Sequence, residues 1–379
     1  MNNLINMQPK RKNNILMLLP VRTQPRYRKR IKGLKDSGAD IKACYFERHY
    51  FDGEALDCES VCLGEMKEGS YLSRIIVLLK ASLTLRQYKS QGIVYCFGMD
   101  MLFLCLLSGL RKHKVAYEVS DIRPDVVQDN LKGKILRAVE KLLLKIVDVV
   151  VVTAPGYIDG YYNNILKVSD KQNFFVLENK LDAAAIPRDN LLLTRDTSKI
   201  HIGYFGLLRC DRSWDALKLL VENYPNQFEV HVFGRPINPI SLPGEANSLA
   251  GITYYGEFMW PADLEKMYCS VDVVWGCYPY GDSAPGNWQW AKTNRFYESC
   301  FFRKPLITLL NSADAAVVSK LNIGFSVDLS DINKTVEFLM SKLSKEYLAS
   351  LTNNLGQVPE QSYLYMDDHD RLIKSIEMV

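Results

Sequence analysis

The sequence predicts an α/β protein with two domains, each built on a parallel sheet. Its 379 residues exceed what one hydrophobic core usually supports, which favours two domains. Short apolar runs alternate with helix-length segments, an arrangement typical of doubly wound sheets. The alternation stops in a polar, proline-containing stretch at 185–198 and then restarts, so we place the domain boundary there.

The first domain is expected over residues 1–185. Residues 15–19, ILMLL, form a continuous apolar run of the kind found in strands covered on both faces. Tyr27, Ile31 and Leu34 then share one helical face with basic residues around the rest, so the stretch RTQPRYRKRIKGLK is predicted to be the helix of a β-α-β unit. The other strands of this domain are expected at 41–47, 93–97, 115–119, 148–153 and 174–179.

The second domain is expected over residues 198–360. It opens with IHIGYF at 200–205, a strand pattern that is followed by a predicted helix at 213–224. Further strands are expected at 228–233, 252–255, 272–276 and 305–309, and further helices at 261–270 and 293–302. Parallel sheets of this kind bind ligands at the carboxyl ends of their strands, so the two domains are expected to face a cleft.

The composition disfavours several classes of protein. The net charge of +4 is small for this length, and one basic helix without base-reading partners argues against nucleic-acid binding. The nine cysteines include no CxxC, which indicates reduced thiols in a cytoplasmic protein. We find no signal-peptide pattern, and the apolar run at 101–110 is shorter than the roughly 20 residues that span a bilayer. The five histidines show no H-x-E or HExxH spacing, so no bound metal is expected.

Three motifs carry a resemblance to a known family. They are IHIGYFGLLRCDRSWDALKLL at 200–220, NRFYES followed by RKPLIT at 294–308, and VAYEVSDIRPDV at 115–126. Together they resemble the GT-B glycosyltransferases, especially the family 4 group of retaining enzymes in bacterial polysaccharide synthesis. The resemblance implies two Rossmann-like parallel-sheet domains facing a cleft, with a C-terminal helix at 361–379 that crosses back to the first domain.

The resemblance also implies a nucleotide site in the second domain. Backbone N–H groups around Gly203 and Gly206 would come close to a diphosphate, and a Cβ at either position would hinder that approach. Arg209 or Arg212 would add positive charge there. Gly256 to Phe258 would contact the base. The alternative is a tight turn with two solvated arginines.

The motif at 294–308 is the most informative stretch of the sequence. By the resemblance, Asn294 opens the motif, Arg295 binds the phosphates and acts in catalysis, and Glu298 takes the ribose hydroxyls. The alternative is an ion pair between residues i and i+3 on a surface helix. Two residues depart from the family pattern, because Trp290 stands where a glutamate is usual and Arg303 where a small residue is usual.

Two further candidate groups complete the expected site. Asp282 and Asn287, in GDSAPGN, would hold sugar hydroxyls, or the segment is a glycine-proline turn. In the first domain, Glu118 and Asp121 follow a predicted strand and would orient or deprotonate an acceptor hydroxyl. The alternative for Asp121 is that it caps the next turn of helix.

The basic stretch and an apolar segment leave membrane contact open. Arg22 and Arg26 would lie near the carboxyl end of the first strand and could meet an anionic acceptor such as a lipid diphosphate. The segment 71–89 combines an apolar face with four basic residues, as in helices that lie on anionic membranes. The alternative is an amphipathic helix that packs on the core.

We therefore expect a metal-independent glycosyltransferase that needs no cofactor beyond its UDP- or GDP-sugar donor. The acceptor would be a hydroxyl of a cell-surface glycan, such as capsule or O-antigen, or of a lipid-linked oligosaccharide precursor. The alternatives are a nucleotide-sugar epimerase on the same fold and a catalytically inactive, membrane-associated binding subunit. The expected location is the cytoplasm, with peripheral contact with the inner face of the plasma membrane as an open alternative.

Overall fold

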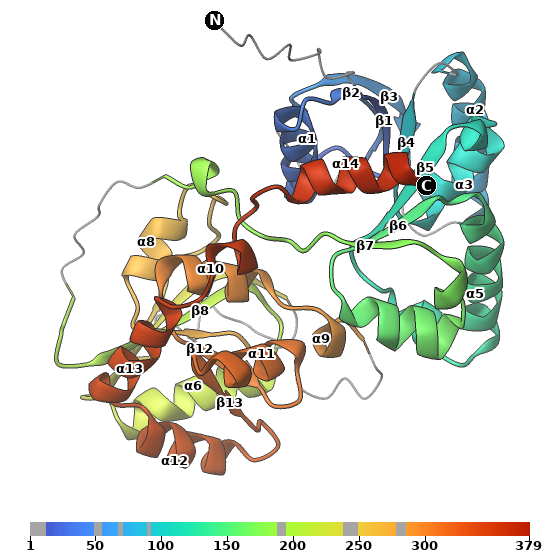
Figure 1. Ribbon diagram of the computed structural model, residues 1–379. Coiled ribbons are helices and arrows are strands. Elements are labelled where there is room, and N and C mark those ends of the chain that lie inside the picture. Colours follow the sequence, from blue (N-terminus) through green and yellow to red (C-terminus); the bar gives the residue numbers. More distant parts are fainter. Residues whose placement is uncertain are drawn as a thin grey trace, which may run out of the picture. The chain divides into compact units, whose positions relative to one another are not determined.

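The computed structural model describes residues 13–48, 55–66, 71–88, 92–187, 195–237, 249–277 and 286–379. The chain divides into two compact units. The first unit consists of Met1–Glu178 and Met366–Val379, and the second of Asn179–Tyr365. Each unit is an α/β structure around one sheet (Figure 1).

The first unit contains a seven-stranded parallel sheet with the order β3-β2-β1-β4-β5-β6-β7. Its strands are β1 (Asn14–Leu19), β2 (Asp40–Glu47), β3 (Glu59–Glu65), β4 (Ile93–Phe97), β5 (Lys114–Val119), β6 (Val149–Val152) and β7 (Phe174–Val176). The six predicted strands are confirmed, and β3 was not predicted. The strand order reverses between β1 and β4, which is where parallel sheets form ligand sites.

Helices cover both faces of this sheet (Figure 1). They are α1 (Pro25–Asp36), α2 (Tyr71–Leu85), α3 (Met99–Leu107), α4 (Pro124–Val127), α5 (Leu131–Leu143) and α14 (Asp368–Met378), with a π-helix at Ile158–Leu166 and short 3-10 turns at Arg86–Tyr88, Leu110–Lys112, Leu144–Ile146 and Ser169–Lys171. The predicted basic helix is α1, which begins at Pro25, a favourable first residue because its φ is already helical. Tyr27, Ile31 and Leu34 are buried as expected, but so is Arg30. The helix α14 packs on α1 and β5.

The second unit contains a six-stranded parallel sheet with the order β10-β9-β8-β11-β12-β13. The strands are β8 (Ile200–Leu208), β9 (Phe228–Pro236), β10 (Ile252–Tyr254), β11 (Val273–Trp275), β12 (Leu306–Leu309) and β13 (Gly324–Val327). The five predicted strands are confirmed, and β13 is additional. The helices are α6 (Asp211–Asn223), α8 (Leu264–Cys269), α9 (Asn287–Trp290), α10 (Asn294–Phe302), α11 (Ala313–Leu321), α12 (Ile332–Lys342) and α13 (Lys345–Leu355), with 3-10 turns at Ala183–Ala185 and Glu360–Ser362.

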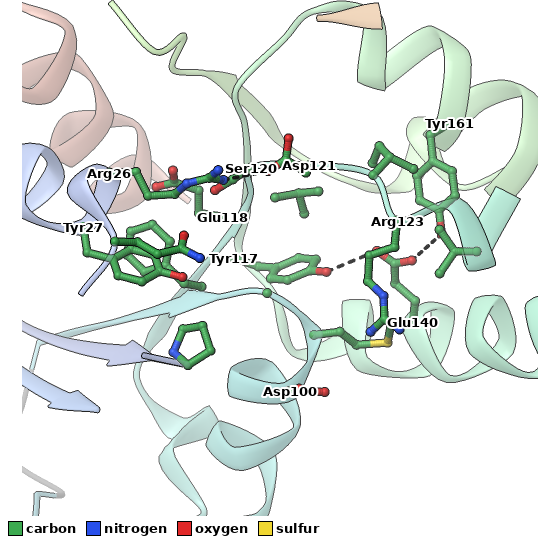
Figure 2. A pocket seen from close by; sticks show the side chains of 18 of the residues that line it. Arg26, Tyr27, Asp100, Tyr117, Glu118, Ser120, Asp121, Arg123, Glu140 and Tyr161 are labelled. Atoms are coloured by element: carbon green, nitrogen blue, oxygen red, sulfur yellow. Dashed lines mark hydrogen bonds and ion pairs between the residues drawn. The ribbon is translucent and has the colours of Figure 1, made fainter. Parts of the chain in front are cut away.

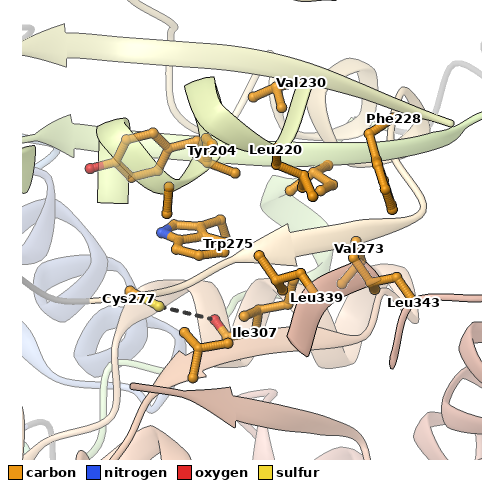
Figure 3. Close-up of a cluster of buried hydrophobic side chains, with 14 of the residues drawn as sticks. Tyr204, Leu220, Phe228, Val230, Val273, Trp275, Cys277, Ile307, Leu339 and Leu343 are labelled. Atoms are coloured by element: carbon orange, nitrogen blue, oxygen red, sulfur yellow. Dashed lines mark hydrogen bonds between the residues drawn. The ribbon is translucent and has the colours of Figure 1, made fainter. Parts of the chain in front are cut away.

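One of two core clusters of the second unit lies between the sheet and the helices α6 and α12. Figure 3 shows Leu220 of α6 and Leu339 of α12 beside strand residues such as Val230 and Trp275. Trp275 has no exposed surface, and burying a side chain of this size contributes about 2–3 kcal/mol or more to folding. This packing fixes the strands whose carboxyl ends carry the predicted nucleotide site. In the described ranges, no helix has the length and apolar character needed to cross a membrane.

Candidate functional site

Two glycines bring the backbones of β8 and β9 together at the carboxyl ends of these strands. Gly206 and Gly234 are in register, and both have positive φ angles, of 102° and 144°. A Cβ on Gly234 would lie 1.8 Å from the carbonyl oxygen of Gly206, so no larger residue fits there. The carboxyl ends of β8 and β9 therefore present backbone without side chains at the place where Gly206 was predicted to approach a diphosphate.

Gly203 has a different role from the one predicted. It lies in the middle of β8, paired with His231, and is buried. A Cβ at this position would lie 2.3 Å from Cζ of the Phe205 ring. Gly203 therefore makes room for the Phe205 side chain and does not belong to a phosphate loop.

Arg295 is held at the same edge of the sheet by α10. Its Nη1 donates to the carbonyl oxygen of Phe205 at 2.8 Å, next to Gly206. Its Nε is buried and has no hydrogen-bond partner among the described residues. A buried donor without a partner is costly, so this guanidinium is suited to receive an anionic ligand.

Glu298 lies one turn after Arg295 on α10 and is 6% exposed. Its Oε2 accepts a hydrogen bond of 2.8 Å from the hydroxyl of Tyr268. Burial, followed by the charge of Glu298, raises the pKa of Tyr268, so the tyrosine remains a donor. The alternative of a surface ion pair between Arg295 and Glu298 does not fit this geometry, because Glu298 is buried against Tyr268. Its binding of a ribose remains a prediction.

Asp314 fixes the start of α10 and was not predicted. Its carboxylate accepts from the backbone N–H of Thr293, the residue before α10, at 3.0 Å. Burial raises the pKa of Asp314 to about 6. No local sequence pattern links the two residues, because the contact joins α11 to the beginning of α10.

The two candidate arginines after β8 differ in their contacts. Arg212 donates from Nε to the carbonyl oxygen of Leu329 at 2.9 Å and from Nη2 to that of Ser330. Arg209 is exposed and has no ion-pair partner in the described part of the chain. Of the two, Arg209 has the guanidinium that is open to a ligand.

The other predicted residues of this site are placed as follows. Gly256 accepts from the N–H of Gly234 at 2.8 Å, which joins the predicted base-binding segment to the glycine pair. Phe258 is half-buried against the other core cluster of the second unit, which includes Leu264 of α8 and Phe296 of α10. Asn287 and Asn294 are the first residues of α9 and α10, and only Asn294 is exposed. Asp282 lies outside the described residues.

The first unit has a pocket of about 340 Å³ near the carboxyl ends of its strands (Figure 2). Asp121 lines this pocket and forms an ion pair with Arg26, with 2.9 Å between Nη1 and Oδ2. The Asp121 side chain is 55% exposed, so its carboxylate is accessible to a ligand. It does not cap the next helix, because α4 follows Arg123.

Glu118 does not have the accessible position that was predicted for a catalytic base. It is 1% exposed, and Arg30 donates to both of its oxygens, at 2.8 and 2.9 Å. The hydroxyl of Tyr95 donates to it at 2.5 Å, and Nη1 of Arg30 also lies 3.1 Å from Nε2 of His369 on α14. This buried network gives Glu118 a structural role, since its carboxylate oxygens are occupied by protein donors.

Glu140 is a second buried acid that lines the pocket and was not predicted. It accepts from three tyrosine hydroxyls, those of Tyr161 at 2.5 Å, Tyr117 at 3.3 Å and Tyr162 at 3.4 Å. Figure 2 shows Tyr117 and Tyr161 pointing toward it from opposite sides. Burial raises the pKa of Glu140. Its partners come from β5 and the π-helix, so no local pattern could have identified the cluster.

Comparison with known proteins gives the same architecture. No family model matches the chain. The chain is 23% identical to the succinoglycan biosynthesis protein ExoL of Rhizobium meliloti, over 96% of this chain and 93% of that protein. The structure superposes on sucrose-phosphate synthase from Thermosynechococcus elongatus with a TM-score of 0.70, at 13% identity, covering 97% of this chain and 99% of the other. It superposes on Anabaena HepE in complex with UDP with a TM-score of 0.64, at 11% identity, covering 96% and 100%. These matches include both units, so the expected GT-B fold is confirmed.

Proposed function

We propose that this chain, a GT-B protein related to ExoL, is a glycosyltransferase that uses a nucleotide diphosphate sugar. The observation that carries the proposal is Arg295, which is held on the Phe205 carbonyl beside Gly206 and whose buried Nε has no partner among the residues that the structure describes. HepE, which shares the fold, is described in complex with UDP, and ExoL is described as a succinoglycan biosynthesis protein. Both descriptions support a sugar donor and a polysaccharide product.

The proposed donor site assigns one task to each group. Arg295 and Arg209 neutralise the diphosphate as it leaves, and Gly206 lets it approach the backbone. Glu298 accepts the ribose hydroxyls, and the segment from Gly256 contacts the base. These groups supply the charge stabilisation through arginine and backbone donors, so the proposed mechanism requires no metal ion.

The proposed acceptor site is the pocket of the first unit. Asp121 is an accessible carboxylate in this pocket, and the ion pair with Arg26 holds it in position. An acceptor hydroxyl within hydrogen-bond distance of Asp121 would be oriented for attack on the donor sugar. The acceptor class we propose is a cell-surface glycan or its lipid-linked precursor.

A binding series tests the donor proposal. We expect UDP or GDP, or one of their sugars, to raise the Tm, since a ligand at about 100 times its Kd adds roughly 2.7 kcal/mol of stability. The measurement is differential scanning fluorimetry with UDP, GDP, CMP and their common sugars, comparing the nucleotide-induced shift with and without EDTA. A shift that survives EDTA supports a metal-independent donor site. No shift with any nucleotide would contradict the proposal, and conversion of a donor sugar without acceptor would favour an epimerase.

We also propose that the first unit contacts an anionic membrane through α2 and α5. Both helices pack on α3, on the same side of the sheet (Figure 1). Large apolar side chains on both helices are between 39% and 76% exposed, namely Ile75, Ile76, Leu79 and Leu83 of α2 and Leu131, Ile135, Val139 and Leu142 of α5. Exposed lysines and arginines lie among them, at Lys80, Arg86, Lys132, Lys134 and Lys141. Exposed apolar side chains with basic neighbours are typical of helices that lie on anionic lipids.

Vesicle binding tests this surface. We expect the protein to sediment with vesicles containing phosphatidylglycerol at low salt and not with neutral vesicles. Replacing Ile135 and Leu142 together by serine should lower the partition coefficient about tenfold or more, because each buried apolar side chain contributes about 1–2 kcal/mol. The matched control is Leu310→Ser, an apolar side chain of the second unit that is 47% exposed. Equal sedimentation with both vesicle types would contradict the membrane proposal. So would a protein that is a dimer in solution and becomes a monomer when Ile135 and Leu142 are replaced, because the apolar surface would then be a dimer interface.

A further inference from the structure

We propose that His201, Glu229 and His231 form a zinc-binding site at the beginning of β8 and β9. His201 and Glu229 are in register on the two strands, and His231 lies two residues further along β9, on the same face as Glu229. Nδ1 of His201 lies 2.9 Å from Nε2 of His231 and 4.0 Å from Oε2 of Glu229. The three donor atoms all lie within 4.8 Å of one another.

The donor set matches zinc chemistry. Two imidazole nitrogens and one carboxylate oxygen are among the usual zinc ligands, at about 2.0–2.2 Å from the ion. Tetrahedral binding at that distance separates two nitrogens by about 3.3 Å, so the present 2.9 Å between them has to widen by only a few tenths of an ångström. Adjacent strands of a sheet hold the ligands on rigid backbone, which favours binding because little ordering remains to be done.

Both histidines have an outer hydrogen-bond partner, which for His201 is a backbone carbonyl of the kind usual for metal-binding histidines and for His231 is a tyrosine hydroxyl. Nε2 of His201 lies 2.8 Å from the carbonyl oxygen of Asp196, so it carries the proton and leaves Nδ1 as a lone pair. Nδ1 of His231 lies 2.9 Å from the hydroxyl of Tyr255, whose ring is stacked on the imidazole. These contacts orient both rings so that the remaining nitrogens face each other.

The two facing nitrogens need either a proton or a cation between them. Without zinc, Nε2–H of His231 donates to Nδ1 of His201. With zinc, that proton moves to Nδ1 of His231 and is donated to the Tyr255 oxygen, so the exchange requires no net gain or loss of protons.

The position of the site indicates what zinc would do. His201 and Glu229 lie near the amino ends of their strands, whereas the glycine pair of the candidate donor site lies near the carboxyl ends. Arg195, a neighbouring cation, is ion-paired with Asp272 at 2.8 Å, which reduces its repulsion of a metal. Zinc would therefore join β8 to β9 and stabilise the second unit without taking part in transfer.

Zinc titration of the untagged, EDTA-dialysed protein tests the inference. We expect isothermal titration calorimetry to give one Zn²⁺ per chain, and the Tm to rise by roughly 5–10 °C at 100 times the Kd. Glu229→Gln should weaken binding at least tenfold, and this half-exposed side chain can be replaced without disturbing the core. Glu222→Gln, an exposed acid of the same unit on α6, is the matched control and should leave binding unchanged.

A second probe identifies the ligands directly. Cobalt in place of zinc should give the visible absorption of a nitrogen- and oxygen-coordinated ion, and His231→Gln should abolish it. Absence of stoichiometric zinc binding, or binding that neither Glu229→Gln nor His231→Gln changes, would leave a hydrogen-bonded histidine pair and overturn the inference. Both readouts are independent of donor binding, so the outcome for zinc and the outcome for the proposed transferase are distinguishable.

Discussion

Replacement of Arg295 by alanine is expected to lower kcat/KM by about 100-fold or more, the usual effect of removing one preorganised charge stabiliser. In the proposed mechanism this guanidinium neutralises the leaving diphosphate, and the bond to the Phe205 carbonyl keeps it in place. Arg295→Lys should recover only part of the activity, because an ammonium cannot hold the carbonyl and bind a phosphate with a planar fork. Steady-state release of the nucleotide diphosphate is the measurement.

Arg212→Ala provides the matched control for this prediction. Its guanidinium also belongs to the second unit, but it donates to the carbonyl oxygens of Leu329 and Ser330. We expect a loss of about 1–2 kcal/mol in stability and a change in kcat/KM much smaller than that of Arg295→Ala. A folded Arg295→Ala protein with nearly normal turnover would remove Arg295 from the mechanism.

Arg30→Met is expected to lower the free energy of unfolding of the first unit by about 3–5 kcal/mol. The substitution leaves the Glu118 carboxylate buried, with Tyr95 as its remaining donor from this network. It also removes the polar contact between Arg30 of α1 and His369 of α14. Urea-induced unfolding, followed by near-ultraviolet circular dichroism, measures the change.

Two controls distinguish a lost ion pair from a lost side chain. Arg30→Met combined with Glu118→Met removes both charges, and most of the stability should return, because no unpaired charge stays buried. Lys32→Met breaks an exposed pair on the same helix, with Asp36 at 2.9 Å, and should cost less than about 0.5 kcal/mol. An Arg30→Met protein within 1 kcal/mol of the wild type would contradict the structural role of Glu118.

The fold was largely predictable because its strands are continuous apolar runs. The two unpredicted strands lack that signal. β3, ESVCLGE, is a largely exposed edge strand, and β13, GFSV, has a glycine and a serine among its four residues and so forms no continuous apolar run. In α1, the helical period identified the buried face of Tyr27, Ile31 and Leu34. It could not identify Arg30 as buried, because the partner Glu118 lies 88 residues away.

The candidate site could be predicted only in part, because many of its contacts join residues that are far apart in the sequence. The motif around Arg295 and Glu298 predicted the helix α10. The structure shows that Arg295 of this helix donates to the carbonyl oxygen of Phe205 in β8. The packing role of Gly203 and the tyrosines around Glu140 depend on contacts between distant segments. The catalytic and ligand-binding roles of Asp121, Arg209 and Arg295 remain predictions for the experiments above.

The C-terminal helix has a consequence for synthesis. His369 of α14 lies over Gly33 of α1, where a Cβ would come within 2.3 Å of its ring, and its Nε2 meets Arg30. The first unit therefore acquires its final packing only after Asn179–Tyr365 has been translated, which takes on the order of ten seconds or more at roughly 5–20 residues per second. During that interval the surface that α14 will cover is exposed on the nascent chain. The unit that is made first is thus the last to be completed.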